Sequence, residues 1–537
     1  MKKILCVGVA LAISLLVISC ASSNAGASSS QKTVQSSARA GKSSKAKKIK
    51  IKDDEYLQRL DEGEYESIIA FLEQRNAKKP GNQFIRDEFE IAMLRHLQKE
   101  YDESARLFEI TDNAMADAVT KSITKGIAAA TLNDNNAEYA GHPYEYIYLN
   151  IINALNYLGK GDIDEAAVEV RKLNDKQRQY LAKYGELLLA QDDDAVEDAA
   201  EGGASGDKKT SSAAAYEMLH IERNAFLAPE KLSKAEKQRI VFRDSPAGRY
   251  LSMVFYLMDG DDGNAALDAR TLKALNASFD TSADLSVPRG KGRLDVLALT
   301  NFIARRDEQR QQYGPFGGFA MRVSSQDIIV PKFDIEVAYP RVPTADQPII
   351  PVAEEFATSG SKYVVTAAQK AIRPLAPSSV RAVKIVMGDG REFALPVLEY
   401  LTNAVVNDVR LGARQAYNRS LTRTIVKKSA AVSAGTASIA AAQNSNQLLA
   451  IIAAMTASKA IDMVDLSETA DIRQVCALPG EFRAGGITLD PGTYSFKVQF
   501  LGNTGADGKP ALLYEESFSD VQVVANRPTL VESVYTN

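Results

Sequence analysis

The chain has 537 residues, enough for several folded domains, and its 45% hydrophobic and 25% charged content is ordinary for a folded protein. Its formal net charge of −4 argues against a dedicated nucleic-acid-binding protein, because such proteins are normally basic. The three cysteines and three histidines are widely separated, which excludes a disulfide framework and the usual spacing of zinc ligands. We therefore predict no metal and no cofactor.

The N-terminus predicts export and a lipid anchor. Lys2 and Lys3 precede an apolar stretch at residues 4–18 that has the length of a secretory signal. The following Ser19-Cys20 completes a pattern that resembles a bacterial lipobox, so residues 1–19 would be removed and Cys20 lipidated. Ala21 then fits sorting to the outer membrane. The alternative is an ordinary cleaved signal peptide or an uncleaved anchor helix, but the apolar stretch is short for a membrane span.

A tether is expected at residues 20–53. Serine, alanine, glycine and lysine dominate residues 21–50, which leaves little to bury and predicts disorder. The lysines of this stretch could contact anionic lipid headgroups, although a solvated linker is the simpler interpretation.

Residues 54–280 are predicted to be helical, and residues 144–180 give the clearest pattern. Tyr148, Ile151 and Leu155 recur at helical spacing, Gly161 interrupts them, and Asp162 can cap a second helix. Residues 161–173 also align without gaps with residues 260–272. The chain therefore contains a repeated helical hairpin.

These hairpins resemble the tetratricopeptide (TPR) unit, in which an aromatic residue on the first helix packs over a small residue on the second. Tyr157 with Ala166, and Tyr256 with Ala265, would take these packing positions. The alternative is another kind of all-helical bundle.

Two interruptions of the helical region stand out. Residues 191–214 are acidic and then rich in glycine and serine, which predicts a flexible loop. Tyr139, His142, Tyr144 and Tyr146 cluster around a proline and form a candidate partner-binding surface. Packing between helices is the alternative explanation of this cluster.

Strand patterns dominate the rest of the chain. Residues 293–300, 328–342 and a hairpin at 380–397 belong to a first β-rich part at 281–398, and residues 471–537 form the second. The second part contains a turn at 490–492 and strands at 512–518, 521–524 and 530–535. Short strands at this spacing predict a β-sandwich-like domain.

Residues 399–470 interrupt this domain as a helical hairpin insertion, whose first helix is expected at 400–428. The small residues of 430–460 could pack against that helix or mediate self-association. The expected fold is thus multidomain α+β: an all-α TPR-like array followed by this domain.

No catalytic constellation is recognisable in the sequence. His96, His142 and His220 are dispersed, with no HExxH pattern, and no GxSxG nucleophile elbow occurs. The basic, glycine-rich residues 289–293 lack the P-loop pattern and read as a turn. We predict no catalytic residues and expect that the protein is not an enzyme.

Four segments together resemble an uncharacterised conserved bacterial lipoprotein family with TPR-like repeats: residues 144–180, 286–297, 414–428 and 471–494. Members more often have Asp-Thr-Arg-Ser-Trp before a Leu-Pro pair, whereas this chain has Ile472, Gln474 and Val475 there. The family has no assigned activity. Some members are encoded beside lipoproteins that activate peptidoglycan synthases, so the resemblance implies a role in envelope assembly.

The expected function is that of a protein-binding scaffold or assembly factor, anchored to the outer membrane, facing the periplasm and gripping envelope proteins along the concave face of the repeats. One alternative is an envelope hydrolase acting on glycan or peptide, which needs a convergent carboxylate or nucleophile–base pair. Another is an oligomeric accessory of a secretion or surface-structure assembly, with residues 430–460 as the self-association element.

Overall fold

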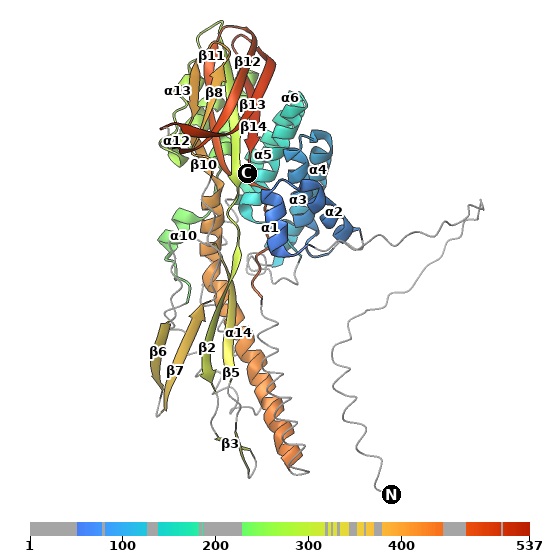
Figure 1. Ribbon diagram of the computed structural model, residues 1–537, viewed down its shortest axis with the longest axis vertical. Helices are drawn as coiled ribbons and strands as arrows, with labels where there is room; N and C mark the ends of the chain where they lie inside the picture. The colour runs from blue at the N-terminus through green and yellow to red at the C-terminus, as the bar shows by residue number, and fades with distance from the viewer. Residues whose placement is uncertain are drawn as a thin grey trace, which may run out of the picture. The chain divides into compact units, whose positions relative to one another are not determined.

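The computed structural model is a mixed helix and sheet structure, as expected for an α+β fold (Figure 1). It describes residues 51–77, 81–125, 138–181, 185, 189, 228–316, 320–323, 326–329, 333–342, 352–358, 361–369, 379–443, 469–505 and 508–536. The lipidation position Cys20, the predicted tether up to residue 50, the loop at 191–214 and residues 444–460 lie outside these ranges. Residues Ile49–Asn537 form one compact unit.

Helices dominate the chain up to residue 285, in agreement with the prediction for residues 54–280. They are α1 (Asp53–Asp61), α2 (Tyr65–Asn76), α3 (Phe84–Leu97), α4 (Tyr101–Lys125), α5 (Pro143–Gly159), α6 (Ile163–Asp175), a π-helical turn (Lys176–Leu181), α10 (Lys234–Ile240), α11 (Pro246–Asp259), α12 (Asp262–Leu275) and α13 (Ser282–Leu285). We call α1–α6, α11 and α12 the helical array.

The array contains four hairpins, α1–α2, α3–α4, α5–α6 and α11–α12, that share one turn. A residue with positive φ follows each first helix: Gly63 (74°), Lys99 (62°), Gly161 (78°) and Gly260 (76°). Its N–H bonds the carbonyl three positions back, and the next N–H bonds the carbonyl five positions back. This pattern satisfies the free carbonyls at a helix end and explains why glycine occurs at three of the four turns.

The aligned hairpins α5–α6 and α11–α12 agree in further detail. Asp162 and Asp261 cap their second helices by accepting the backbone N–H three residues on, at 3.2 and 3.0 Å. The residue four positions after the cap is completely buried in all four hairpins. These residues are Ile68, Ser104, Ala166 and Ala265.

Within the described ranges, the strands form three four-stranded sheets and a two-stranded one, in the orders β10-β11-β1-β14, β13-β12-β8-β9, β5-β2-β7-β6 and β3-β4. Their bounds are β1 (Gly292–Phe302), β2 (Asp307–Phe316), β3 (Ala320–Val323), β4 (Gln326–Ile329), β5 (Phe333–Arg341), β6 (Val352–Thr358), β7 (Ser361–Gln369), β8 (Ala382–Met387), β9 (Glu392–Leu395), β10 (Val397–Tyr400), β11 (Pro479–Leu489), β12 (Gly492–Thr504), β13 (Pro510–Val523) and β14 (Pro528–Tyr535). The two β-rich parts of the sequence pair directly, since β1 bonds β11 and β8 bonds β12.

Three predicted boundaries need correction. The strand expected at 328–342 is divided between β4 and β5, and the two strands expected at 512–524 are one strand, β13, with Asp520 in a bulge at φ 60°. The helix expected to end at Lys428 continues to Gln443 as α14 (Leu401–Gln443). Alanine has the highest helix propensity of all residues, which explains why the alanine-rich stretch prolongs this helix.

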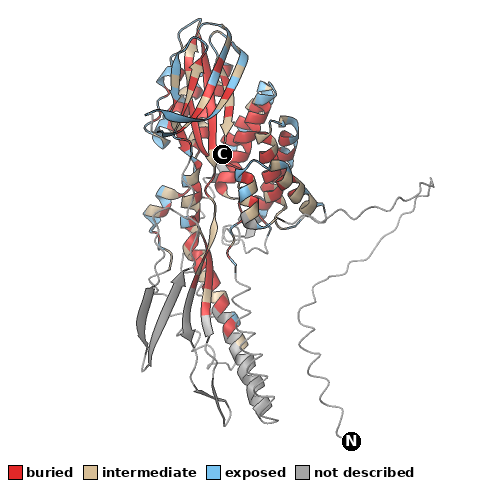
Figure 2. Ribbon diagram, viewed as in Figure 1, coloured by how far each residue is buried: buried red, intermediate tan, exposed pale blue. Residues whose placement is uncertain are grey.

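Two hydrophobic clusters hold these elements together (Figure 2). The smaller cluster lies between the first two sheets and includes Val296 of β1, Ile385 of β8 and Phe496 of β12. The larger cluster joins the helical array to the sheet β10-β11-β1-β14 and to the start of α14. The helical and strand-rich parts of the chain, which meet near residue 280, therefore share one hydrophobic core.

Candidate functional site

The first helices of the array hold an extended segment of the same chain, residues 471–478, which precedes β11. Two carboxylates accept its backbone N–H groups. Glu145 at the start of α5 accepts from Val475 at 2.8 Å, and Glu90 in α3 accepts from Cys476 at 2.7 Å. Both carboxylates are buried. Because a buried N–H left without an acceptor is costly, this pair of hydrogen bonds fixes the segment against the array.

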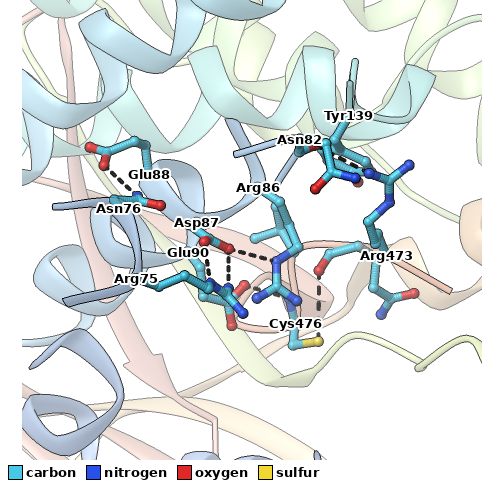
Figure 3. Close-up of polar contacts among 12 residues, drawn as sticks. Arg75, Asn76, Asn82, Arg86, Asp87, Glu88, Glu90, Tyr139, Arg473 and Cys476 are labelled. Carbon is cyan, nitrogen blue, oxygen red and sulfur yellow. Dashed lines mark hydrogen bonds and ion pairs between the residues drawn. The ribbon is translucent and has the colours of Figure 1, made fainter. Parts of the chain in front are cut away.

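Each of these carboxylates has a tyrosine partner as well. Tyr56 of α1 donates to Glu90 at 2.7 Å, and Tyr139 donates to Glu145 at 2.5 Å. Burial raises the pKa of Glu90, while the nearby Arg86 guanidinium and the Tyr56 hydroxyl oppose that shift. The segment and the array thus meet in a polar junction inside the fold. Figure 3 shows the part of it that contains Glu90, Arg86 and Cys476.

Arg473 anchors the beginning of the segment. Its guanidinium donates to the Asp471 carboxylate at 2.7 Å and to the backbone oxygen of Asn82 at 3.1 Å. It also lies 5.4 Å from the centre of the Tyr139 ring, within the range of a cation–π interaction. Figure 3 labels both side chains. Arginine therefore ties the segment to the residues just before α3 and α5.

His142 joins this junction to α14. One ring nitrogen, Nε2, lies 3.0 Å from the backbone oxygen of Arg473, and the other, Nδ1, lies 3.2 Å from the Asp408 carboxylate. Arg306 pairs with Asp408 as well. Burial opposes ionisation of Asp408, but Arg306 and His142 outweigh it and lower the pKa of this carboxyl to about 2. The arrangement orients His142, but it contains no nucleophile.

Cys476 is a free cysteine at the end of the segment. Burial raises the pKa of its thiol to about 12, and the negative charge of Glu90 adds to the shift. Since the thiolate is the reactive form of cysteine, this side chain is inert at neutral pH.

Helices α3 and α11 also contact the sheets, through buried polar groups. His96 of α3 lies between Asn156 of α5 and Glu532 of β14, at 2.8 and 2.9 Å. Glu399 of β10 accepts from Ser245 Oγ at 2.7 Å and from the backbone N–H of Ala247 at 2.8 Å, at the N-terminus of α11. Thus α3 and α11 each face the β part of the chain.

The predicted partner-binding residues lie in this junction and not on an exposed surface. Tyr139, Tyr144 and Tyr146 are 3%, 0% and 9% exposed, and His142 stacks on Tyr144 with ring centres 5.4 Å apart. The expectation of an exposed aromatic surface is therefore wrong for the three tyrosines, because they pack between helices and against the segment. The repeat-packing residues Ala166, Ala265 and Tyr157 are buried, and Tyr256 is partly buried against the same cluster.

Sequence reasoning missed Glu90 and Glu145. Glu145 did carry a signal, since it stands in α5 between Tyr144 and Tyr146 in an almost wholly apolar helix. A charged residue in such a helix needs a buried polar partner. Its partner, Val475, is 330 positions away and cannot be identified from local sequence.

Asp284 and Asp295 form a carboxylate pair inside the fold, whereas the hydrolase alternative needs a pair that a substrate can reach. Arg293 bridges the two at 3.0 and 2.8 Å, and both carboxylates are buried. Within the described ranges, no group of three or more histidine, cysteine, aspartate or glutamate residues could hold a metal ion. In the same part of the chain, no helix is long and apolar enough to cross a membrane.

Comparison with known proteins finds no family model, no curated protein and no solved structure that matches this chain.

Proposed function

We propose that this chain is a lipid-anchored envelope protein that binds other envelope proteins through its helical array, as a scaffold or assembly factor. The observation that carries the proposal is the fourfold recurrence of one hairpin, with the same turn and the same buried position after the cap. Stacked TPR-like hairpins present a preformed surface, so a partner binds with little loss of conformational entropy. The two sheets that share a core support a β-sandwich-like domain beside this array.

The array offers its second helices, not its first, to a partner. Three of the four first helices, α3, α5 and α11, contact residues 471–478, β10 or β14. Large apolar residues are exposed on three of the second helices, with exposed fractions from 38% to 52%. These residues are Ile110 of α4, Ile163 of α6, and Leu267 and Leu275 of α12. Contiguous exposed apolar patches are typical of protein contact surfaces, and these four residues are the positions on the second helices where such a patch would form.

Charge substitution on the exposed helices tests the binding proposal. Leu267→Asp leaves the core untouched but places a charge where an apolar contact is expected, so the amount of partner captured after crosslinking in intact envelopes should fall about tenfold or more. Val524→Asp is the matched control, because Val524 is exposed to a similar extent (53% against 52%) but follows β13. Equal capture by the wild type and both variants would overturn the proposal.

The membrane anchor has its own test. Cys20→Ser should release the protein into the soluble fraction, because the acyl chains that would hold it are lost. Cys6→Ser changes the other cysteine of the signal segment and should leave fractionation unchanged. If the Cys20→Ser protein remains with membranes, the lipid anchor is refuted.

A further inference from the structure

Helix α11 is bordered by buried carboxylates that outnumber their cationic partners. Glu399 of β10 is buried against its N-terminus, where the hydrogen-bond donors are the uncharged Ser245, Tyr148 and the N–H of Ala247. Asp244, next in line, adds negative charge, and the one nearby cation, Arg249 of α11, is already paired with Asp244 at 2.7 Å and with Asp268 at 2.9 Å. The positive end of the helix offsets part of the cost, but an ionised Glu399 has lost its water without gaining a cation of its own, which is unfavourable.

The second site faces Tyr250 in the same helix. Arg293 Nε lies 3.0 Å from Asp284 Oδ1 and 2.8 Å from Asp295 Oδ1, so one guanidinium serves two carboxylates. The Tyr250 hydroxyl faces Asp295, and both side chains are almost completely buried. Because Arg293 neutralises only one of the two carboxylates, a proton on one of the carboxyl groups would remove the excess charge.

A metal ion would not serve this second site. The guanidinium of Arg293 occupies the position between the two carboxylates, and its positive charge would repel a cation. A proton needs no extra room and leaves the ion pair with Arg293 in place.

We propose that α11 is held against the sheets by two buried protons, one on Glu399 and one shared by Asp284 and Asp295, and that this helix loosens from β10 and from Asp295 of β1 when the pH rises. The helical array and the β part would then be joined by a proton-dependent contact. This inference is independent of the proposed partner binding.

The expected titration behaviour agrees with the geometry. Burial raises the pKa of Glu399 to about 7, although Ser245, Tyr148 and the N–H of Ala247 oppose the shift. Burial also raises the pKa of Asp295 to about 7, opposed by Arg293 and reinforced by Asp284. A carboxyl group with a raised folded-state pKa favours the closed state at low pH. Its contribution is lost as the pH rises from the ordinary carboxyl value of about 4 to about 7.

Hydrogen exchange of the full-length chain between pH 5 and pH 8.5 tests the proposal. After correction for intrinsic exchange rates, the opening constant of α11 amides should rise about tenfold per pH unit for each proton held, and level off above pH 7. Glu399→Gln and Asp295→Asn each remove one of the two protons, so each variant should show a rise in the opening constant that is about tenfold smaller per pH unit. Asp389→Asn, in the exposed turn between β8 and β9, is the matched control and should leave it unchanged. Identical slopes in the wild type and all variants would overturn the proposal.

A second measurement needs no variant and covers the case in which a substitution prevents folding. The infrared carbonyl band of protonated carboxylic acids is recorded for the unaltered chain at pH 6 and pH 8. Each group with a pKa of about 7 should fall from about nine-tenths to about one-tenth protonated, so we expect the band to lose intensity equivalent to about 1.6 carboxyl groups over this range. A chain without that loss holds no such protons, and the proposal would be wrong.

Discussion

The Glu90 carboxylate in α3 accepts the backbone N–H of Cys476 at 2.7 Å, across 386 positions of sequence. Glu145 makes the equivalent contact with Val475 from α5. Two helices of the array thus bind one extended segment of the same chain. This junction explains why the array and the sheets share a hydrophobic cluster and occupy one compact unit.

Removal of the Glu90 carboxylate should weaken this junction. Glu90→Ala leaves the N–H of Cys476 and the hydroxyl of Tyr56 without their acceptor, which costs about 1–3 kcal/mol for each buried group left unpaired. Urea unfolding followed by circular dichroism measures the loss. Glu103→Ala is the control, because Glu103 makes an exposed pair with Arg106 that contributes about 0–1 kcal/mol. A Glu90→Ala protein as stable as this control would contradict the role of the junction.

The shared hairpin turn predicts opposite effects for two glycines three residues apart. Gly260→Ala should destabilise the chain by about 1 kcal/mol, because its φ of 76° is unfavourable for any residue with a Cβ. Gly263→Ala should stabilise it by about 0.5–1 kcal/mol, because Gly263 lies inside α12 and an added Cβ meets no atom closer than 3.5 Å. Midpoints of thermal unfolding give both values. If both substitutions shift the midpoint in the same direction, the turn assignment is incorrect.

Gly486 lies opposite Asp295 in the β1–β11 pairing. A Cβ at this position would lie 2.1 Å from Asp295 Oδ1, so Gly486→Ala should displace the carboxylate and destabilise the fold by about 1–3 kcal/mol. At Gly492 an added Cβ meets Tyr494 at an ordinary 3.7 Å, and Gly492→Ala should have a much smaller effect. Comparable unfolding midpoints for the two variants would show that the space at Gly486 is not needed.

His96 predicts a pH effect of its own. Burial lowers the pKa of His96, but the charge of Glu532 and its hydrogen bond to the imidazole outweigh burial. The pKa of His96 is therefore raised above its ordinary value. A histidine whose pKa is raised by folding stabilises the fold fully below about pH 6.5. This stabilisation is lost as the pH rises through the pKa of the folded state. Glu532→Gln should therefore lower the pKa of His96 and flatten this loss.

Proton NMR of the imidazole rings measures that change directly, because the chain has only three histidines. His142 does not contact Glu532 and serves as the internal reference. An unchanged titration of His96 in the Glu532→Gln variant would mean that the contact with β14 does not govern its charge.

The hairpins were predictable because their signals are local. Gly161 and Gly260 mark the turns, Asp162 and Asp261 cap the next helices, and each lies within a few residues of the structure that it specifies. The turn after Leu489 was found for the same reason. The pairing of the strands on either side of this turn was not predictable, because β11 and β12 belong to different sheets although only two residues separate them.

The candidate site was not predictable from these patterns. Tyr139 and Tyr144 have the composition of a contact surface, but the segment that buries them begins more than 300 positions later. Helical periodicity distinguishes apolar from polar faces and does not identify which distant segment satisfies a buried carboxylate such as Glu145. Only the tertiary structure brings Arg473, Val475 and Cys476 to the array.

The central claim, that the exposed helices of the array bind an envelope protein, is tested most directly by site-specific photocrosslinking in intact cells. A photoreactive residue is placed at Ile110, Leu267 or Leu275 of the array, or at the comparably exposed Leu512 of β13 as a control. We predict one discrete adduct of the same mass from the array positions and none from Leu512. Adducts at Leu512 alone, or no adduct at any array position, would contradict the account.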